Sequence, residues 1–259
     1  MEILINKIIV KLLTFLLIIT NSLLIAQDSV PNPYEFNCEN FDMTVVGNLR
    51  MNVQLVSNSL FNYIKKDSIS IPKINSSDQN TLWKEFNVQF KGIITEHCVN
   101  SKVLQDDKII SAPFCDERTK ITIVAKIENY FIFNVKAFEI DDYILFNTKN
   151  QVVYFSNSFP TILDNGKVII DIEMHTMYNH GVEFYEMEND IPKTFRVSFP
   201  RQYNLQKSYI VKDWNNKVKV LLDLIRYDLK ETAPSENSSN TQYVYDKDRY
   251  CRKLIVISK

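Results

Sequence analysis

The sequence predicts an all-β fold, an antiparallel β-sandwich, and three observations carry this prediction. Apolar and polar residues alternate with a period of two in several stretches, as they do in half-buried strands. Turn signals such as Asn165-Gly166 and Asn215-Asn216 separate these stretches. No long segment shows the clean 3.6-residue period of an amphipathic helix. Two packed β modules are the alternative architecture.

The alternating stretches follow one another along the chain. The residues expected to lie on one face of each strand are Leu49, Met51, Val53 and Leu55; Phe86, Val88 and Phe90; Ile121, Ile123, Ala125 and Ile127; and Phe195, Val197 and Phe199. Segments 57–66 and 221–229 are expected as short helices. Segments 75–80 and 231–241 are rich in Ser and Asn, and they are expected as polar loops inside one domain rather than as linkers.

The N-terminal segment has the pattern of a secretory signal peptide. Lys7 and Lys11 precede an apolar run, residues 12–19, and a polar break leads to Ala26-Gln27. A membrane-spanning helix needs roughly 20 largely apolar residues, which this segment does not have. We therefore expect removal of residues 1–26, and a single β-rich domain, residues 27–259, that is exported to the periplasm, cell surface or extracellular space without a transmembrane segment. An uncleaved anchor is the alternative.

Charge and glycine content exclude several classes of function. The chain has 30 basic and 31 acidic residues without a basic block, which argues against a nucleic-acid partner. Its four glycines are widely separated, whereas phosphate-cradling loops need several close together. The G-x-S-x-G turn of many serine hydrolases is also missing from the sequence.

The four cysteines are expected to form disulfides. An even number of cysteines in an exported chain favours disulfides over metal-bound thiolates. Three connectivities are possible, and we predict Cys98 with Cys115, which closes a short loop, and Cys38 with Cys251, which joins the two ends of the chain. Four buried thiols are the alternative.

Residues 170–188, IDIEMHTMYNHGVEFYEME, hold two of the three histidines and several acidic side chains. We expect a hairpin that turns at residues 179–181. A three-residue loop places His175 opposite Tyr185 and Glu173 opposite Met187, and it avoids pairs of like charges. This register predicts an ordinary solvated hairpin face.

A two-residue loop in the same hairpin would instead place carboxylates opposite one another. A bound Ca²⁺ would relieve that repulsion, with Glu173, His175 and Glu186 as candidate ligands. Asp171, Glu173 and His175 are the candidate catalytic residues in this case. The matching function would be a secreted hydrolase that uses carboxylates or a bound cation.

Aromatic residues are dense between positions 130 and 159. Most are expected in the core, and Tyr143, Tyr154 and Phe155 are the candidates for an exposed binding patch. Because the glycine-dependent catalytic motifs are missing, we expect a non-enzymatic binding or structural protein of the cell envelope or extracellular space. Its expected ligand is a protein or a glycan of the envelope, without a cofactor, and the hydrolase is the alternative.

Overall fold

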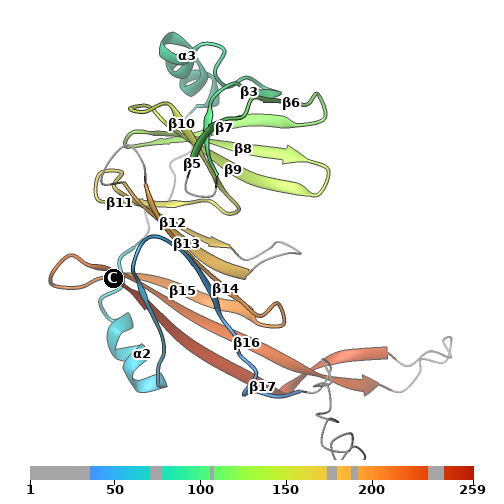
Figure 1. Ribbon diagram of the computed structural model, residues 1–259. Coiled ribbons are helices and arrows are strands. Elements are labelled where there is room, and N and C mark those ends of the chain that lie inside the picture. Colours follow the sequence, from blue (N-terminus) through green and yellow to red (C-terminus); the bar gives the residue numbers. More distant parts are fainter. Residues whose placement is uncertain (1–35, 71–77, 106–107, 174–179, 188–191, 233–241) are drawn as a thin grey trace, which may run out of the picture. The chain divides into compact units, whose positions relative to one another are not determined.

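A computed structural model describes residues 36–70, 78–105, 108–173, 180–187, 192–232 and 242–259 (Figure 1). The chain divides into two compact units, residues 1–37 and 38–259. Only Phe36 and Asn37 of the first unit are described, so all elements below belong to the second. The expected signal peptide, residues 1–26, lies outside the described residues.

The fold is all-β and sandwich-like, as predicted, with two short helices among the described residues. In chain order the elements are β1 (Thr44–Gly47), β2 (Asn52–Leu55), α2 (Asn58–Lys65), α3 (Gln79–Phe90), β3 (Cys98–Val99), β4 (Lys102–Gln105), β5 (Lys108–Ser111), β6 (Phe114–Cys115), β7 (Lys120–Ile127), β8 (Tyr130–Ala137), β9 (Ile140–Asn147), β10 (Val152–Ser156), β11 (Thr161–Leu163), β12 (Val168–Glu173), β13 (His180–Glu186), β14 (Lys193–Phe199), β15 (Asn204–Lys212), β16 (Val218–Thr232) and β17 (Gln242–Ser258).

A six-stranded sheet, in the order β5-β4-β10-β9-β8-β7, has helix α3 on one face (Figure 1). The prediction of a strand at residues 86–90 is wrong. Leu82, Phe86 and Phe90 follow a four-residue spacing and are buried in the core of this sheet, whereas Val88 is 84% exposed. Asp78 begins the helix, because its side chain accepts a hydrogen bond from the Asn80 N–H. A spacing of four residues, as between Phe86 and Phe90, fits both the two-residue period of a strand and the 3.6-residue period of a helix. The spacing of these two residues therefore did not distinguish strand from helix.

A five-stranded sheet follows the order β1-β14-β13-β12-β11. Ile169 and Tyr185 of this sheet share one buried cluster with Tyr130, Leu145 and Tyr154 of the six-stranded sheet. Side chains from two sheets thus form a common core, which is the defining feature of a sandwich.

A four-stranded sheet, in the order β15-β16-β17-β2, is covered on one face by helix α2. This helix was predicted, and the Ser57 side chain caps it by accepting a hydrogen bond from the Leu60 N–H. The prediction of a helix at 221–229 is wrong, because these residues lie in β16. Leu221 and Leu222 are both buried, on opposite faces of the sheet, so this strand does not show the alternation of a half-buried strand.

The hairpin of β16 and β17 extends beyond its own sheet (Figure 1). Strand β15 pairs with β16 only up to Ile225, and β2 pairs with β17 only from Ile255 onward. Among the described strands, the remaining part of the hairpin therefore pairs only with itself. A disulfide joins Cys251 in this ribbon to Cys38.

The second disulfide joins Cys98 in β3 to Cys115 in β6, so both bridges have the partners that the sequence analysis expected. The two polar loops are only partly described. Residues 78–80 belong to the start of α3, and residues 231–232 to the end of β16. Residues 75–77 and 233–241 lie outside the described residues.

Candidate functional site

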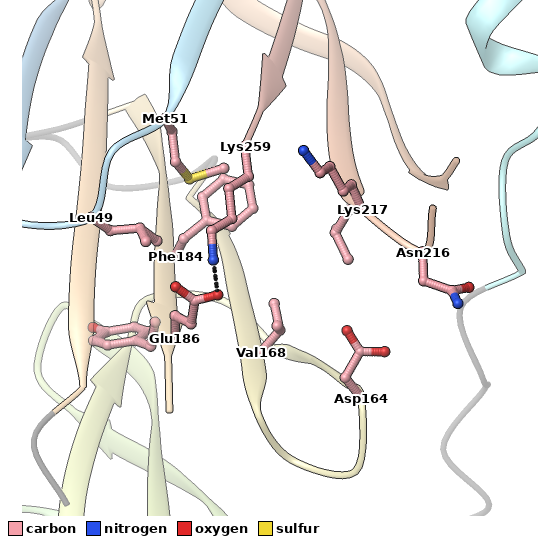
Figure 2. A pocket seen from close by; sticks show the side chains of 11 residues that line it. Leu49, Met51, Asp164, Val168, Phe184, Glu186, Asn216, Lys217 and Lys259 are labelled. Atoms are coloured by element: carbon pink, nitrogen blue, oxygen red, sulfur yellow. Dashed lines mark hydrogen bonds and ion pairs between the residues drawn. The ribbon is translucent and has the colours of Figure 1, made fainter. Parts of the chain in front are cut away.

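A pocket of about 270 Å³ is lined by side chains of the five-stranded and four-stranded sheets and of the segments that flank their strands (Figure 2). Its lining residues are Leu49, Met51, Asp164, Val168, Phe184, Tyr185, Glu186, Asn216, Lys217, Val218 and Lys259. The walls are mainly apolar, and a few charged groups stand among them. This composition is typical of sites for small molecules.

Strand register places the apolar wall next to the carboxylate of Glu186. Phe184 and Glu186 are two residues apart on β13, so they share a face of the sheet. Val168 on β12 lies directly opposite Glu186. Leu49 is held against the sheet by a backbone hydrogen bond of 2.8 Å from its N–H to the Thr194 carbonyl oxygen.

Glu186 is the chemically unusual residue of this pocket. One of its carboxylate oxygens, Oε1, forms an ion pair with the ammonium group of Lys259 (Figure 2). The other oxygen, Oε2, is buried and has no hydrogen-bond partner among the described residues. A buried acceptor without a partner costs free energy, so its occurrence needs an explanation.

The β15–β16 turn supplies the opposite side of the pocket. Asp213 holds this turn, because its Oδ1 accepts hydrogen bonds from the N–H groups of Asn215 and Lys217 at 2.9 and 3.0 Å. The Lys217 ammonium has no carboxylate partner in the part of the chain that is described. Asp164 is already neutralised by Lys212 at 2.5 Å. Among the described residues, the pocket thus combines a buried acceptor without a partner, on Glu186, with a cation, on Lys217, that has no carboxylate partner.

The expected hairpin register is wrong. Glu173 lies opposite Gly181, and Tyr185 lies opposite Ile169 rather than His175. His180 and Gly181 belong to β13, so the turn does not lie there. A Cβ on Gly181 would come within 2.4 Å of the Val197 carbonyl oxygen, so this glycine permits a close approach between two strands. His175 lies outside the described residues.

The sequence predicted that Asp171 lies on a solvated face, and this prediction is wrong, because Asp171 is only 1% exposed. Its carboxylate accepts hydrogen bonds from the N–H groups of Asn157 and Ser158, at 2.8 and 3.2 Å, and from the Ser158 hydroxyl. Through these hydrogen bonds Asp171 organises the loop after β10.

A neighbouring carboxyl, that of Asp142, has a raised pKa. Burial is the largest cause, and the negative charges of Asp171 and Asp141 raise this pKa further.

The three candidate metal ligands are not brought together. Glu173 and Glu186 occur at opposite ends of the β12–β13 ladder, five residue pairs apart, which corresponds to roughly 17 Å. The third, His175, falls in segment 174–179, which is not described. Within the described ranges, no three carboxylate, imidazole or thiol groups are close enough to hold an ion.

The three candidate aromatic residues do not form one patch. Tyr154 is 1% exposed and belongs to the core, so its assignment to a binding surface is wrong. Tyr143 is half-buried and packs edge-on against Phe159 at 5.4 Å. Phe155 is 50% exposed, and it points to the other face of the sheet from its neighbour Tyr154.

Sequence reasoning named Glu186, but as a metal ligand, and it missed Lys217 and Lys259 as site residues. Leu49 and Met51 carried a signal, since both fall on the predicted inward face of one alternating stretch. No helix among the described residues is long and apolar enough to cross a membrane. Comparison with protein families, with curated proteins and with solved structures finds no match for this chain.

Proposed function

We propose that this protein is an exported, non-catalytic binding protein whose ligand occupies the pocket around Glu186. One observation carries the proposal: Glu186, which lines a hollow with apolar walls, has a buried carboxylate oxygen without a hydrogen-bond partner among the described residues. A ligand with an N–H donor would satisfy this oxygen, and its apolar part would lie against Met51, Val168 and Phe184.

The size and charge of the pocket define the ligand class. An engineered apolar cavity of about 150 Å³ in another protein binds benzene, so about 270 Å³ suits a small bicyclic or branched molecule. Leaving a buried acceptor unpaired costs about 1–3 kcal/mol, and a ligand ammonium or amide would recover this free energy. Lys217 offers a cation to an acidic group of the ligand. We therefore expect a small apolar molecule that carries an ammonium or amide group.

The export part of the proposal rests on the N-terminal pattern and on the disulfides. Disulfides form and persist in oxidising compartments such as the periplasm and the extracellular space. The small molecule in the pocket is a new proposal, and the partner expected from the sequence, a protein or glycan of the envelope, would bind elsewhere on the surface.

A thermal-shift screen of apolar amines, amides and amino acids against purified residues 27–259 tests the proposed function. We expect at least one compound to raise the melting temperature, and calorimetry to give a single site. Val168→Phe should abolish this binding because it fills the pocket. Glu186→Gln should weaken the binding of ammonium ligands about tenfold or more, since it removes the negative charge of the group that accepts their N–H hydrogen bonds.

Phe138→Ala is the matched control, because Phe138 is 88% exposed and does not line the pocket. It should bind as the wild type does. A screen without hits, or equal binding by Val168→Phe, would refute the assignment of the pocket. Turnover of a glycan, ester or peptide substrate that disappears in Glu173→Gln would favour the hydrolase instead.

A further inference from the structure

A second candidate site lies where helix α3 meets the start of strand β7. Two adjoining hollows, of about 450 and 790 Å³, share the side chains of Asn80, Trp83 and Asn87. These three residues follow a spacing of three and four along α3, so they form one stripe on the helix. The shared stripe makes the hollows two consecutive parts of one groove, which we call the Trp83 groove.

Trp83 is held in place from within the fold. Its ring packs against Phe86 at 6.0 Å and against Phe133 at 5.5 Å between ring centroids, and both phenylalanines are fully buried. The indole is half-buried and borders both hollows. The ring is therefore already oriented before a ligand stacks on it. Binding would not lose the conformational entropy that is lost when a mobile side chain becomes immobilised.

The groove surrounds this indole with neutral hydrogen-bonding groups. The carboxamides of Gln79, Asn80 and Asn87 are exposed, and in the described structure no internal hydrogen bond uses them. Each carboxamide offers two donors and an acceptor in one plane. Thr122 adds a hydroxyl on the β7 side. Both donors and acceptors thus line the hollow beside an aromatic ring.

The two hollows differ in charge. The larger and shallower one is lined by Lys84 and Lys91, without a carboxylate. The other contains one acid and one base, Glu96 and Lys120, so it is close to neutral. A ligand that spans the groove would therefore meet a neutral part first and a positive part at the Lys84 end.

We propose that the Trp83 groove binds an oligosaccharide of at least two units, with an acidic unit beside Lys84 and Lys91. A sugar ring has one face of C–H groups, which packs on an indole, and a rim of hydroxyls that both donate and accept hydrogen bonds. The carboxamide stripe matches that rim, and the two lysines match a carboxylate or sulfate. This inference does not depend on the pocket around Glu186.

A peptide fits the same groove less well. An extended peptide would add to the free edge of β7 through backbone hydrogen bonds. At the start of that edge the Ile121 N–H already donates to the Glu96 carbonyl oxygen at 2.7 Å. The Lys126 ammonium also bridges the edge strand to Glu85 of α3. Side-chain recognition of a saccharide does not need these backbone groups.

The tryptophan content of the chain allows a direct test. The protein has two tryptophans, and Trp214 is 91% exposed, so Trp214→Phe leaves Trp83 as the fluorescent reporter without loss of packing. We would titrate residues 27–259 carrying this change with cello-, xylo- and chito-oligosaccharides as neutral probes, and with oligogalacturonates and oligoalginates as acidic probes.

The expected result is a saturable change in Trp83 fluorescence, with tighter binding of at least one acidic probe than of the neutral ones. Asn87→Ala should weaken binding about fivefold to tenfold, the effect of one lost hydrogen bond. Lys84→Ala with Lys91→Ala should remove the preference for acidic probes. Asn62→Ala, an exposed asparagine on α2, is the matched control and should leave affinity unchanged.

Three results would overturn the proposed saccharide site, and a fourth would overturn its acidic unit. The first is no binding of any saccharide probe to a folded protein, as judged by its melting temperature. The second is saccharide binding that Asn87→Ala does not change, which would place the site elsewhere. The third is a fluorescence response to a random peptide library together with none to saccharides. Equal affinity for neutral and acidic probes would contradict the acidic unit.

Discussion

Replacement of Asp171 separates a structural role from a catalytic one. Its buried carboxylate accepts three hydrogen bonds from Asn157 and Ser158, and these bonds hold the loop between β10 and β11. Asp171→Ala would leave two loop N–H groups without their acceptor. If Asp171 is structural, this change should lower the free energy of unfolding and leave ligand binding in the Glu186 pocket intact.

The magnitude follows from the number and type of bonds. A hydrogen bond to a charged group contributes about 1.5–3 kcal/mol, and such contributions are not additive in one loop. Water can partly replace the carboxylate because Asn157 and Ser158 are half-buried. Removal of Asp171 also relieves repulsion with Glu183, which lies opposite it on β13. We expect a loss of about 3 kcal/mol for Asp171→Ala.

Asp171→Asn should lose about half as much, because the amide keeps one carbonyl oxygen as acceptor. For a domain of this size, about 3 kcal/mol lowers the melting temperature by roughly 6–12 °C. Urea unfolding followed by circular dichroism gives the free energies. Glu117→Ala, an exposed acid in a turn, is the control and should stay within about 0.5 kcal/mol of the wild type. A loss below about 1 kcal/mol for Asp171→Ala would refute the reasoning.

Three further predictions follow from the cysteines, from Asp142 and from the N-terminus. Cys38→Ser should leave Cys251 as a free thiol that is labelled in denaturant, since Cys251 is buried in the folded protein. The change should destabilise by up to about 5 kcal/mol, because the bridge closes a loop of 213 residues, and absence of a labelled thiol in the unfolded, unreduced variant would contradict the pairing. Because burial and neighbouring charge raise the folded-state pKa of Asp142, its ionised form opposes folding, so Asp142→Asn should stabilise the protein at neutral pH. That gain should vanish as the pH falls below about 4, where the wild-type carboxyl is also neutral, and a gain independent of pH would refute it. N-terminal sequencing of exported protein should begin at Gln27, and an intact Met1 would disprove cleavage.

Several features of the fold were accessible from local sequence alone. The alternation in β7 and β14 identified both strands, because each buries one face more deeply than the other. The start of helix α2 was predictable, because Ser57 caps it by accepting a hydrogen bond from the Leu60 N–H, three residues along the chain. The predicted pairing of Cys98 with Cys115, which closes a short loop, is also confirmed.

Predictions from local sequence patterns were wrong where the same residue type, at the same spacing, is compatible with more than one kind of secondary structure. Phe86 and Phe90 fit a strand and a helix equally, and only the sheet that α3 covers shows that the helix buries them. Gly181 resembles a turn residue, but the neighbouring strand requires it, since a Cβ would meet the Val197 carbonyl oxygen. The register of β12 and β13 therefore depends on β14, which follows them in the sequence.

The sequence by itself determined the fold class and the absence of glycine-dependent catalytic motifs, since each rests on residue type and short-range spacing. It allowed three pairings of the cysteines, and the structure decided for the predicted one. Tertiary structure alone decided the candidate site. Leu49, Glu186, Lys217 and Lys259 come from segments up to 210 positions apart, and they meet because two sheets place them around one hollow. The Glu186 oxygen is buried because these segments pack around it, so no local sequence pattern could have predicted its burial.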